Sequence, residues 1–448
     1  HHGQTMKKAA LIALAAAAGA DAFAPAGLPS LRTGRSTPNS CQLSMHAAKD
    51  TKGGAAARIA SGLAGGFATA SLLLSPALDV VQHPLGPSDG GAVHAQGATS
   101  KKSTRGAPSK DANKDPESIL RLSLPINEKN PIRQAQAALE MDMDKALKES
   151  RNEKWAKVAG LARKSVNVMQ QKEKDILKDV PADRQDEAKA LITEITKGLG
   201  DLGQTIETQK KEAVEAKKRS VLAKIGDLEQ LMVKAFPYDI PEEFSNLPQL
   251  KGRAEVDLVL KKGAGGQFDV DGTVFEKLNL RLVLDGYSAP VTAGNVVDLI
   301  NKGFYNGMQI QRSDGFVVQT GDPSPEDLDA VHGYSEGGKE RTVPLEILAE
   351  EDKVPTWGVT LEDDGRPLSQ PQLPFSVYGT LSMARVEDNV DSGSSQWFFL
   401  LFDPELVTAG RNLMDGRYST FGYVTEGNRG LSNVEVGDVI ESIKVVKA

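Results

Sequence analysis

The stretch that decides the fold is GFVVQTGD, at residues 315–322. Its core of aromatic and β-branched residues between two glycines predicts a short buried strand with a turn at each end. Similar strand patterns occur at residues 254–260, 278–284, 379–384, 397–401, 419–424 and 438–446, and a short amphipathic helix is expected at 289–302. About eight short strands with two helices predict a closed β-barrel for residues 251–448.

Five motifs follow one another in order across this region. They are PVTAGN at residues 290–295, FVVQTGD at 316–322, GTLSMA at 379–384, SSQWFF at 394–399, and the pairs DG and FG at 415–416 and 421–422. Together they resemble the signatures of the cyclophilin-type peptidyl-prolyl isomerases. The resemblance implies the closed eight-stranded cyclophilin-like barrel, and an enzyme whose substrates are proline-containing proteins or peptides.

Prolyl isomerisation suits a chain with few reactive side chains. The X-Pro bond turns slowly because of amide resonance, with a barrier of roughly 18–20 kcal/mol. Lowering this barrier needs an apolar slot for the proline ring and a fixed donor to the prolyl nitrogen, but no nucleophile and no proton transfer. A guanidinium suits the donor role because it stays charged and its fork of N–H groups is rigid.

The resemblance also implies roles for individual residues of the groove. It makes Arg312 the donor and Gln319 the side chain that holds the substrate carbonyl, and these two are the expected catalytic residues. The expected substrate-binding residues are Phe316, Val317, Ala384, Arg385, Gln396, Phe398, Leu413, Met414 and Tyr418. No metal and no cofactor is implied. The alternative for the phenylalanines is that they only pack in the core of the barrel. The alternative for Arg312 is that it is a surface arginine without a catalytic role.

The position of the arginine departs from the family pattern. Arg312 lies four residues before Phe316, whereas the family arginine lies five residues before the equivalent phenylalanine. Strict spacing therefore gives Gln311. The assignment of Arg312 requires a one-residue deletion in the turn at residues 313–315.

Three groove positions also carry unusual residues. Leu413 stands where the family has a tryptophan, Tyr418 where a histidine is usual, and Arg385 where a smaller polar residue is common. Loss of the indole removes a large apolar wall and one N–H donor. Leu413, Tyr418 and the shortened turn at 313–315 favour weak catalysis, or binding without catalysis.

Residues 323–375 form a much longer loop than compact family members have at this place. The loop is rich in acidic residues and contains several prolines. Long irregular loops tend to be functional or mobile. We expect that this insertion binds a partner or folds over the groove. The alternative is an insertion without a specific function.

Composition excludes several classes of function. The chain has a net charge of −7, although residues 1–95 carry more basic than acidic side chains. Binding to nucleic acid draws on clustered Lys and Arg, so the acidic remainder argues against such a partner. Beyond residue 95 the sequence contains no cysteine and only one histidine, His332. A chain that begins there has no disulfide, no thiol chemistry and no Cys/His zinc site.

Residues 1–95 are typical of a targeting leader with two parts. Two lysines after Met6 precede the apolar run at 9–20, and small residues follow, as in a signal peptide. An FAP motif at 23–25 and a segment rich in Ser, Thr and Arg at 30–52 then resemble a transit peptide. The combination resembles the leaders of algae with complex plastids.

A second apolar run, at residues 59–78, ends near the sequence AVHA at 92–95. The small residues predict a second cleavage after Ala95, as in a lumenal transfer peptide. The alternative is a permanent membrane span, which the Gly, Ala and Ser content and Pro76 make less favourable. We expect a mature protein of the plastid thylakoid lumen that associates with membranes only through partners.

The middle of the chain has helical periodicity. Residues 96–115 lack large apolar side chains and are expected to form a flexible tail, and residues 116–250 are expected to form an all-α helical bundle. A helix is predicted to begin at Asn130 and Pro131, and residues 183–235 are expected to be helical with few breaks. Apolar residues there step by three and four, at Ile192, Ile195, Leu199, Leu202 and Ile206 and again at Val221, Ile225, Leu228 and Met232. An antiparallel bundle is favoured over an intermolecular coiled coil.

With its leader and its helical region, the whole chain resembles the large thylakoid-lumen cyclophilins of photosynthetic organisms. Three classes of function follow. The first is a prolyl isomerase of lumenal proteins, which Arg312 and Gln319 favour. The second is a catalytically weak or inactive assembly factor that binds photosystem proteins, which Leu413 and Tyr418 favour. The third is a helical scaffold that the barrel only stabilises.

Overall fold

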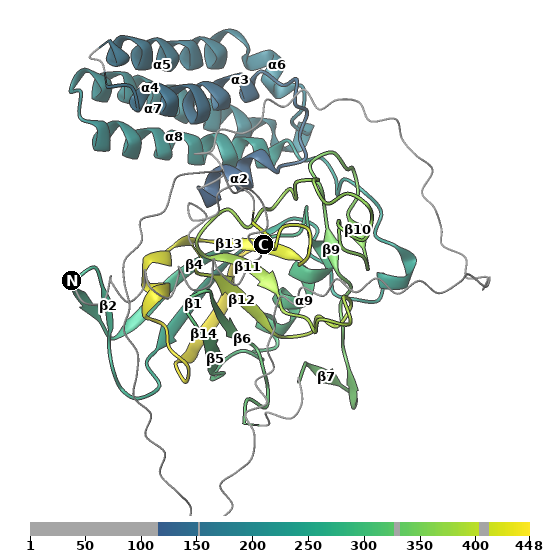
Figure 1. Cartoon of the computed structure of the whole chain (residues 1–448). Helices are drawn as coiled ribbons and strands as arrows, with labels where there is room; N and C mark the ends of the chain where they lie inside the picture. Colours follow the sequence, from purple (N-terminus) through teal and green to yellow (C-terminus); the bar gives the residue numbers. More distant parts are fainter. Residues whose placement is uncertain (1–114, 151–152, 327–331, 403–411) are drawn as a thin grey trace, which may run out of the picture. The chain divides into compact units, whose positions relative to one another are not determined.

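The computed structural model describes residues 115–150, 153–326, 332–402 and 412–448 (Figure 1). Helices occupy the first part of this range and the main sheet occupies the second, which gives the α+β organisation that was expected. The predicted leader at 1–95 and the tail up to residue 114 lie outside the described residues. No helix among the described residues is long and apolar enough to cross a membrane.

The helical region contains short helices followed by three long ones. In chain order they are α2 (Pro116–Leu122), α3 (Ile132–Ala137), the π-helical η2 (Ala138–Asp142), α4 (Met143–Leu147), α5 (Lys154–Gln171), α6 (Glu173–Leu177), the 3-10 helix η3 (Ala182–Arg184), α7 (Gln185–Glu207), α8 (Lys211–Leu231) and the 3-10 helix η4 (Glu242–Phe244). The helix that was predicted to begin at Asn130 and Pro131 begins one residue later, at Ile132, and the Asn130 Oδ1 accepts a hydrogen bond from the Ile132 N–H at 3.0 Å.

The apolar stripes of the long helices pack against one another. Helix α7 contacts both α5 and α8, and the stripe residues Ile195, Leu202 and Ile225 are fully buried in this contact. The segment at 183–235, which was predicted to be helical with few breaks, forms the two helices α7 and α8 and ends its last helix at Leu231. Gln209 has a φ of 55°, in the left-handed region, and the chain there leaves α7 and begins α8.

A network of charged side chains is buried among these helices. The Arg133 Nη1 lies 3.1 Å from the Glu229 Oε1, and the Arg121 Nε lies 2.6 Å from the Glu140 Oε1. The Gln136 amide joins the two pairs, because it accepts from Arg133 and donates to Glu140. Burial raises the pKa of Glu229 to about 8, although the nearby Arg133 opposes this shift.

The main sheet has eight antiparallel strands. They are β1 (Arg253–Lys261), β4 (Lys277–Asp285), β5 (Ile310–Ser313), β6 (Val317–Thr320), β11 (Thr380–Met383), β12 (Trp397–Leu400), β13 (Thr420–Glu426) and β14 (Val439–Lys447). Their order across the sheet is β14-β1-β4-β13-β11-β12-β6-β5. Seven of these strands overlap the predicted ones. Strand β5 was not predicted.

The sheet is curled but open, so the expected closed barrel was wrong. Its outer strands, β5 and β14, do not form a ladder with each other. The segment before β5 meets the start of β14 only through the isolated bridge between Gln309 and Val439 and a few backbone hydrogen bonds, such as that from the Ile310 N–H to the Asp438 carbonyl. Strand β5 has only four residues, and it pairs with β6 rather than along the nine-residue β14.

Helix α9 (Pro290–Asn301) packs on the core of the sheet. Proline is its first residue, where the missing N–H costs nothing. Val296 and Leu299 from α9 join Leu258, Trp397 and Phe421 from the strands in one buried cluster. Apart from α9, the described part of this domain has only the 3-10 helix η6 (Asn428–Asn433) after β13, whereas two helices were expected.

The remaining strands form small hairpins. They are β2 (Phe268–Val270) with β3 (Thr273–Phe275), β7 (Ser335–Glu336) with β8 (Lys339–Glu340), and β9 (Glu346–Ile347) with β10 (Thr356–Trp357). The last two pairs belong to the long insertion at 323–375. The insertion also has a small apolar cluster of its own, formed by Leu345, Ile347, Ala349 and Leu361.

Glu346 anchors the insertion to helix α9. This side chain is 1% exposed, and its carboxylate accepts hydrogen bonds from the backbone N–H groups of Val291 and Thr292 and from the Thr292 hydroxyl, at 2.9–3.2 Å. Burial raises the pKa of Glu346 to about 7, against the lowering by these three donors. The insertion therefore satisfies the free N–H groups at the first turn of α9.

Candidate functional site

Arg312 and Gln319 lie opposite each other on strands β5 and β6. The register pairs Ile310 with Thr320 and Arg312 with Gln319, which leaves Gln311 as the extra residue of a β-bulge. Directly opposed residues project to the same face of a sheet. The short connection between the strands thus places Arg312 beside Gln319. Because Gln311 is the extra residue of the bulge, Ile310 lies opposite Thr320.

The Gln396 amide is the centre of a hydrogen-bonded network next to this pair. Its Oε1 accepts from the Gln319 Nε2 at 2.9 Å and from the Gln311 Nε2 at 2.5 Å. Its Nε2 donates to the Asp322 Oδ2 at 3.0 Å and to the His332 carbonyl at 2.7 Å. Gln311 and Gln319 therefore both donate to the Gln396 Oε1, and Gln319 does so through the nitrogen of its amide.

An apolar cluster lies beside the amide network. It joins most of the residues that the sequence assigned to the groove, namely Phe316, Val317, Ala384, Phe398, Met414 and Tyr418, with Phe375, Leu400 and Phe402. Phe398 is 4% exposed, and the Tyr418 ring meets it edge to face at a centroid distance of 5.8 Å. Aromatic rings and a methionine form a surface that suits a proline ring.

Two of the unusual groove residues interact with each other. The Arg385 guanidinium lies over the Tyr418 ring, 4.9 Å from its centre, and donates hydrogen bonds to the carbonyls of Arg417, Val386 and Glu387. This contact is a cation–π interaction that fixes the tyrosine. Leu413, in contrast, is 68% exposed and does not belong to the apolar cluster.

The Arg312 guanidinium is bound by a carboxylate from its own turn. Its Nε and Nη2 lie 2.7 and 2.5 Å from the Asp314 Oδ2. Partial burial raises the pKa of Asp314, but the hydrogen bonds from the Phe316 and Val317 N–H groups and the Arg312 charge outweigh it and leave the pKa below its usual value. Asp314 therefore stays ionised and paired at neutral pH.

Sequence reasoning missed three residues of this site. Phe375 is 1% exposed and packs against Phe398 and Tyr418, at centroid distances of 6.3 Å, but it lies at the end of the insertion, where no motif marks it. Asp322 joins the Gln396 network and belongs to the quoted GFVVQTGD stretch, so its place in a motif was the available signal. Asp314 precedes a glycine, which signals a turn.

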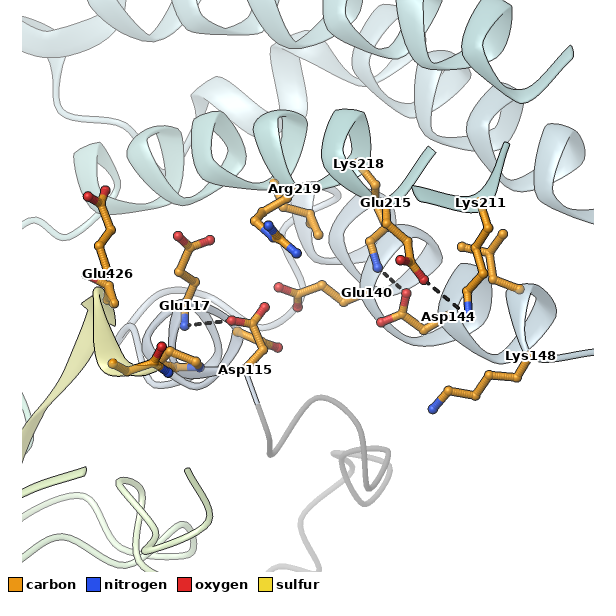
Figure 2. Close-up of a pocket in the computed structure, with 16 residues that line it drawn as sticks. Asp115, Glu117, Glu140, Asp144, Lys148, Lys211, Glu215, Lys218, Arg219 and Glu426 are labelled. Carbon is orange, nitrogen blue, oxygen red and sulfur yellow. Dashed lines mark hydrogen bonds and ion pairs between the residues drawn. The ribbon is translucent and has the colours of Figure 1, made fainter. Parts of the chain in front are cut away.

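A separate cavity of about 690 Å³ is lined largely by charged side chains of the helical region (Figure 2). Both acidic and basic groups line it. Lys218 pairs with Asp144, and Lys211 lies 3.6 Å from Glu215. This mixture offers no single charge to a ligand. No group of three His, Cys, Asp or Glu side chains in the described segments is placed to hold a metal ion.

Two family models match the chain. The model described as "Peptidyl-prolyl cis-trans isomerase CYP38-like, PsbQ-like domain" matches residues 115–233. The model described as "Cyclophilin type peptidyl-prolyl cis-trans isomerase/CLD" matches residues 270–448. The matches thus cover most of the helical region and most of the sheet domain.

Curated relatives agree with these matches. The chain is 44% identical to the chloroplastic peptidyl-prolyl cis-trans isomerase CYP38 of Arabidopsis thaliana over 333 residues, which are 74% of each chain. It is 44% identical to a putative thylakoid lumen peptidyl-prolyl cis-trans isomerase of Synechocystis over 334 residues, 74% of this chain and 82% of that one. It is 28% identical to the chloroplastic CYP37 of Arabidopsis thaliana over 74% of this chain and 69% of that one. This chain belongs to the cyclophilin-type peptidyl-prolyl cis-trans isomerases, in the CYP38-like group that carries a PsbQ-like domain before the cyclophilin domain.

Proposed function

We propose that the groove isomerises X-Pro bonds with Arg312 as the donor to the prolyl nitrogen. The proline ring enters the apolar cluster between Phe316 and Phe398, and the Gln319 amide holds the substrate carbonyl. As the bond twists, the lone pair of the prolyl nitrogen leaves amide resonance and accepts a hydrogen bond from the guanidinium. The observation that supports this assignment best is the pairing of Arg312 with Gln319 across β5 and β6.

The decisive experiment compares Arg312 with Gln311, the residue that strict family spacing favours. Arg312→Ala should lower kcat/KM by roughly a hundredfold, the usual loss for one preorganised donor. Arg312→Lys should not restore the rate, because a point charge on a flexible stem does not reproduce the fork. Gln311→Ala should cost much less. Equal rates for wild type and Arg312→Ala would refute the assignment.

A second candidate is a binding factor with little catalysis, which assists the assembly of photosystem proteins. The exposed Leu413 and the Arg385 guanidinium over Tyr418 favour it. Leu413 does not form the apolar wall that a tryptophan provides at this position, and the contact between Arg385 and Tyr418 changes a second part of the slot. A proline peptide that binds to the chain but isomerises at its spontaneous rate would support this candidate. A rate enhancement that disappears in Arg312→Ala would exclude it.

We also propose a plastid thylakoid lumen as the site of action. The relatives that carry chloroplast and thylakoid lumen in their names support this location. The predicted cleavage after Ala95 gives a mature chain that begins at Gln96, reaches the membrane only through partners and acts on proline-containing lumenal proteins, photosystem subunits among them. N-terminal sequencing of the protein from washed thylakoids, and crosslinking to photosystem subunits there, test these proposals.

A further inference from the structure

The turn between β5 and β6 is organised by a single carboxylate. Gly315 has a φ of 83°, which favours glycine, and Asp314 precedes it. The Asp314 Oδ1 accepts hydrogen bonds from the backbone N–H groups of Phe316 at 2.9 Å and Val317 at 3.1 Å. These N–H groups belong to two residues of the apolar cluster, so the carboxylate is fixed to the backbone of the slot.

The other oxygen of the same carboxylate holds Arg312. The Asp314 Oδ2 accepts from the Nε and the Nη2 of the guanidinium, at 2.7 and 2.5 Å. Two contacts to one edge of a planar group define its orientation, because the guanidinium cannot rotate about either bond alone. The Nη1 lies on the other edge of the fork, and it remains directed away from Asp314.

We propose that Asp314 is a positioning residue, which ties the guanidinium of Arg312 to the backbone of the slot and so orients the donor before substrate binds. This inference rests on the proposed role of Arg312. A long arginine side chain loses considerable rotamer freedom when it is held in one geometry. Asp314 removes that freedom in the free enzyme, so the loss does not have to occur on the way to the transition state. Asp314 itself does not touch the substrate.

The variant Asp314→Asn separates the two functions of the carboxylate. Its amide oxygen can still accept from the Phe316 and Val317 N–H groups, which preserves the turn. Its NH₂ group replaces the Oδ2 and cannot accept from Arg312. Ser313→Ala is the matched control, because Ser313 lies in the same turn but its hydroxyl donates to the Val434 carbonyl, outside the turn, and not to the guanidinium.

The measurements use the whole mature chain from Gln96 and a proline-containing peptide. We expect Asp314→Asn to lower kcat/KM by about tenfold, less than the loss of the donor itself. The peptide Kd, from calorimetry, should remain within about twofold of wild type, because the orientation of the donor matters for the transition state. Ser313→Ala should keep both values. A parallel loss of affinity and thermal stability in Asp314→Asn would instead indicate a structural role and overturn the inference.

A double-mutant cycle distinguishes this inference from the function on which it rests. In the Arg312→Ala background, Asp314→Asn should change kcat/KM by less than about twofold, since there is no guanidinium left to position. An undiminished effect in that background would refute the positioning role and leave the donor role intact. No effect of Arg312→Ala in an active enzyme would refute both.

Nuclear magnetic resonance tests whether Asp314 holds the Arg312 guanidinium, even if the protein does not catalyse isomerisation. The side-chain Nε–H signal of Arg312, identified by its absence in Arg312→Ala, should exchange slowly with water in wild type and in Ser313→Ala. It should exchange faster in Asp314→Asn, because its acceptor is gone. A signal that exchanges rapidly in wild type would show that the guanidinium is not held, and would overturn the inference independently of any rate.

Discussion

The helical bundle and the groove both bury a polar network, but they build it from different side chains. The bundle uses ionic groups, with Arg133 against Glu229 and Arg121 against Glu140. The groove uses neutral amides, with Gln319 and Gln311 bound to Gln396. Amides do not titrate, whereas a buried carboxylate changes its pKa and its charge with its surroundings. Apart from the Asp322 carboxylate, which accepts from the Gln396 Nε2, the groove network should therefore be independent of pH, and the bundle should carry pH dependence.

The largest expected effect comes from breaking an ionic pair in the bundle. Arg133→Met leaves the fully buried Glu229 without its cation, which should lower the free energy of unfolding by about 3–5 kcal/mol at alkaline pH, where the carboxyl ionises. The loss should be smaller at neutral and acid pH, because Glu229, with a pKa of about 8, then folds in its neutral form. Chemical denaturation at acid and alkaline pH measures both effects.

Glu229→Gln is the matched control for this variant. It keeps an acceptor for the Arg133 N–H and removes the titrating group, so it should cost less than Arg133→Met, and that cost should depend less on pH. The kcat/KM of folded protein should change in neither variant. An Arg133→Met protein of wild-type stability would mean that the buried pair is not formed in solution.

An intermediate effect is expected from the centre of the amide network. Gln396→Leu leaves the Gln319 and Gln311 amides without their shared acceptor, which should cost about 1–3 kcal/mol of unfolding free energy and lower kcat/KM. Unlike the loss in the bundle variant, this loss should be the same at neutral and alkaline pH. Denaturation curves at the two pH values test the contrast directly, and a loss that varies with pH would contradict the neutral character of the groove network.

A smaller effect is expected at Leu413, where the groove lacks the apolar wall that a tryptophan would form. Leu413→Trp adds an indole at a position that is 68% exposed. A partly buried aromatic contact should tighten the binding of a proline-containing peptide by about 1 kcal/mol, or roughly fivefold. Leu413→Ala serves as the control and should bind no tighter than wild type. Calorimetry that shows no gain for the tryptophan variant would mean that residue 413 lies outside the occupied groove.

The bundle could be predicted from periodicity because its stripes repeat along the sequence. Ile195, Leu202 and Ile225 occupy the positions that steps of three and four assign to a seam, and all are buried. The exact position of the break, at Gln209, could not be predicted because Glu207–Lys211 is polar, and a polar helix face and a polar turn have similar sequences. Strand β5 was missed for a similar reason, since its sequence IQRS has only one apolar residue.

The groove could be predicted only as far as its motifs reached. The sequence predicted that Phe316, Phe398 and Gln396 belong to one groove, because each lies in a short motif at a strand. It did not reveal Phe375, whose contact with Phe398 depends on how a long insertion returns to the sheet. The open seam between β5 and β14 depends on strand lengths, which strand patterns define only to within a few residues.

The smallest effect is expected at Glu346, which belongs to the cyclophilin domain but is ionisable like the bundle pairs. Its pKa of about 7 lies above that of an exposed glutamate, so the folded chain binds a proton that the unfolded chain releases. Stability is then greatest below the unfolded pKa of about 4.3 and is lost as the pH rises through about 7. The three hydrogen-bond donors favour the carboxylate and so keep this pKa from rising further, and stability should fall as the pH rises from 5 to 7. Glu346→Gln keeps an acceptor but cannot titrate, so its unfolding free energy should lack this slope. Identical slopes in wild type and Glu346→Gln would assign the pH dependence to the bundle alone, and the contrast between the two networks would then hold without exception.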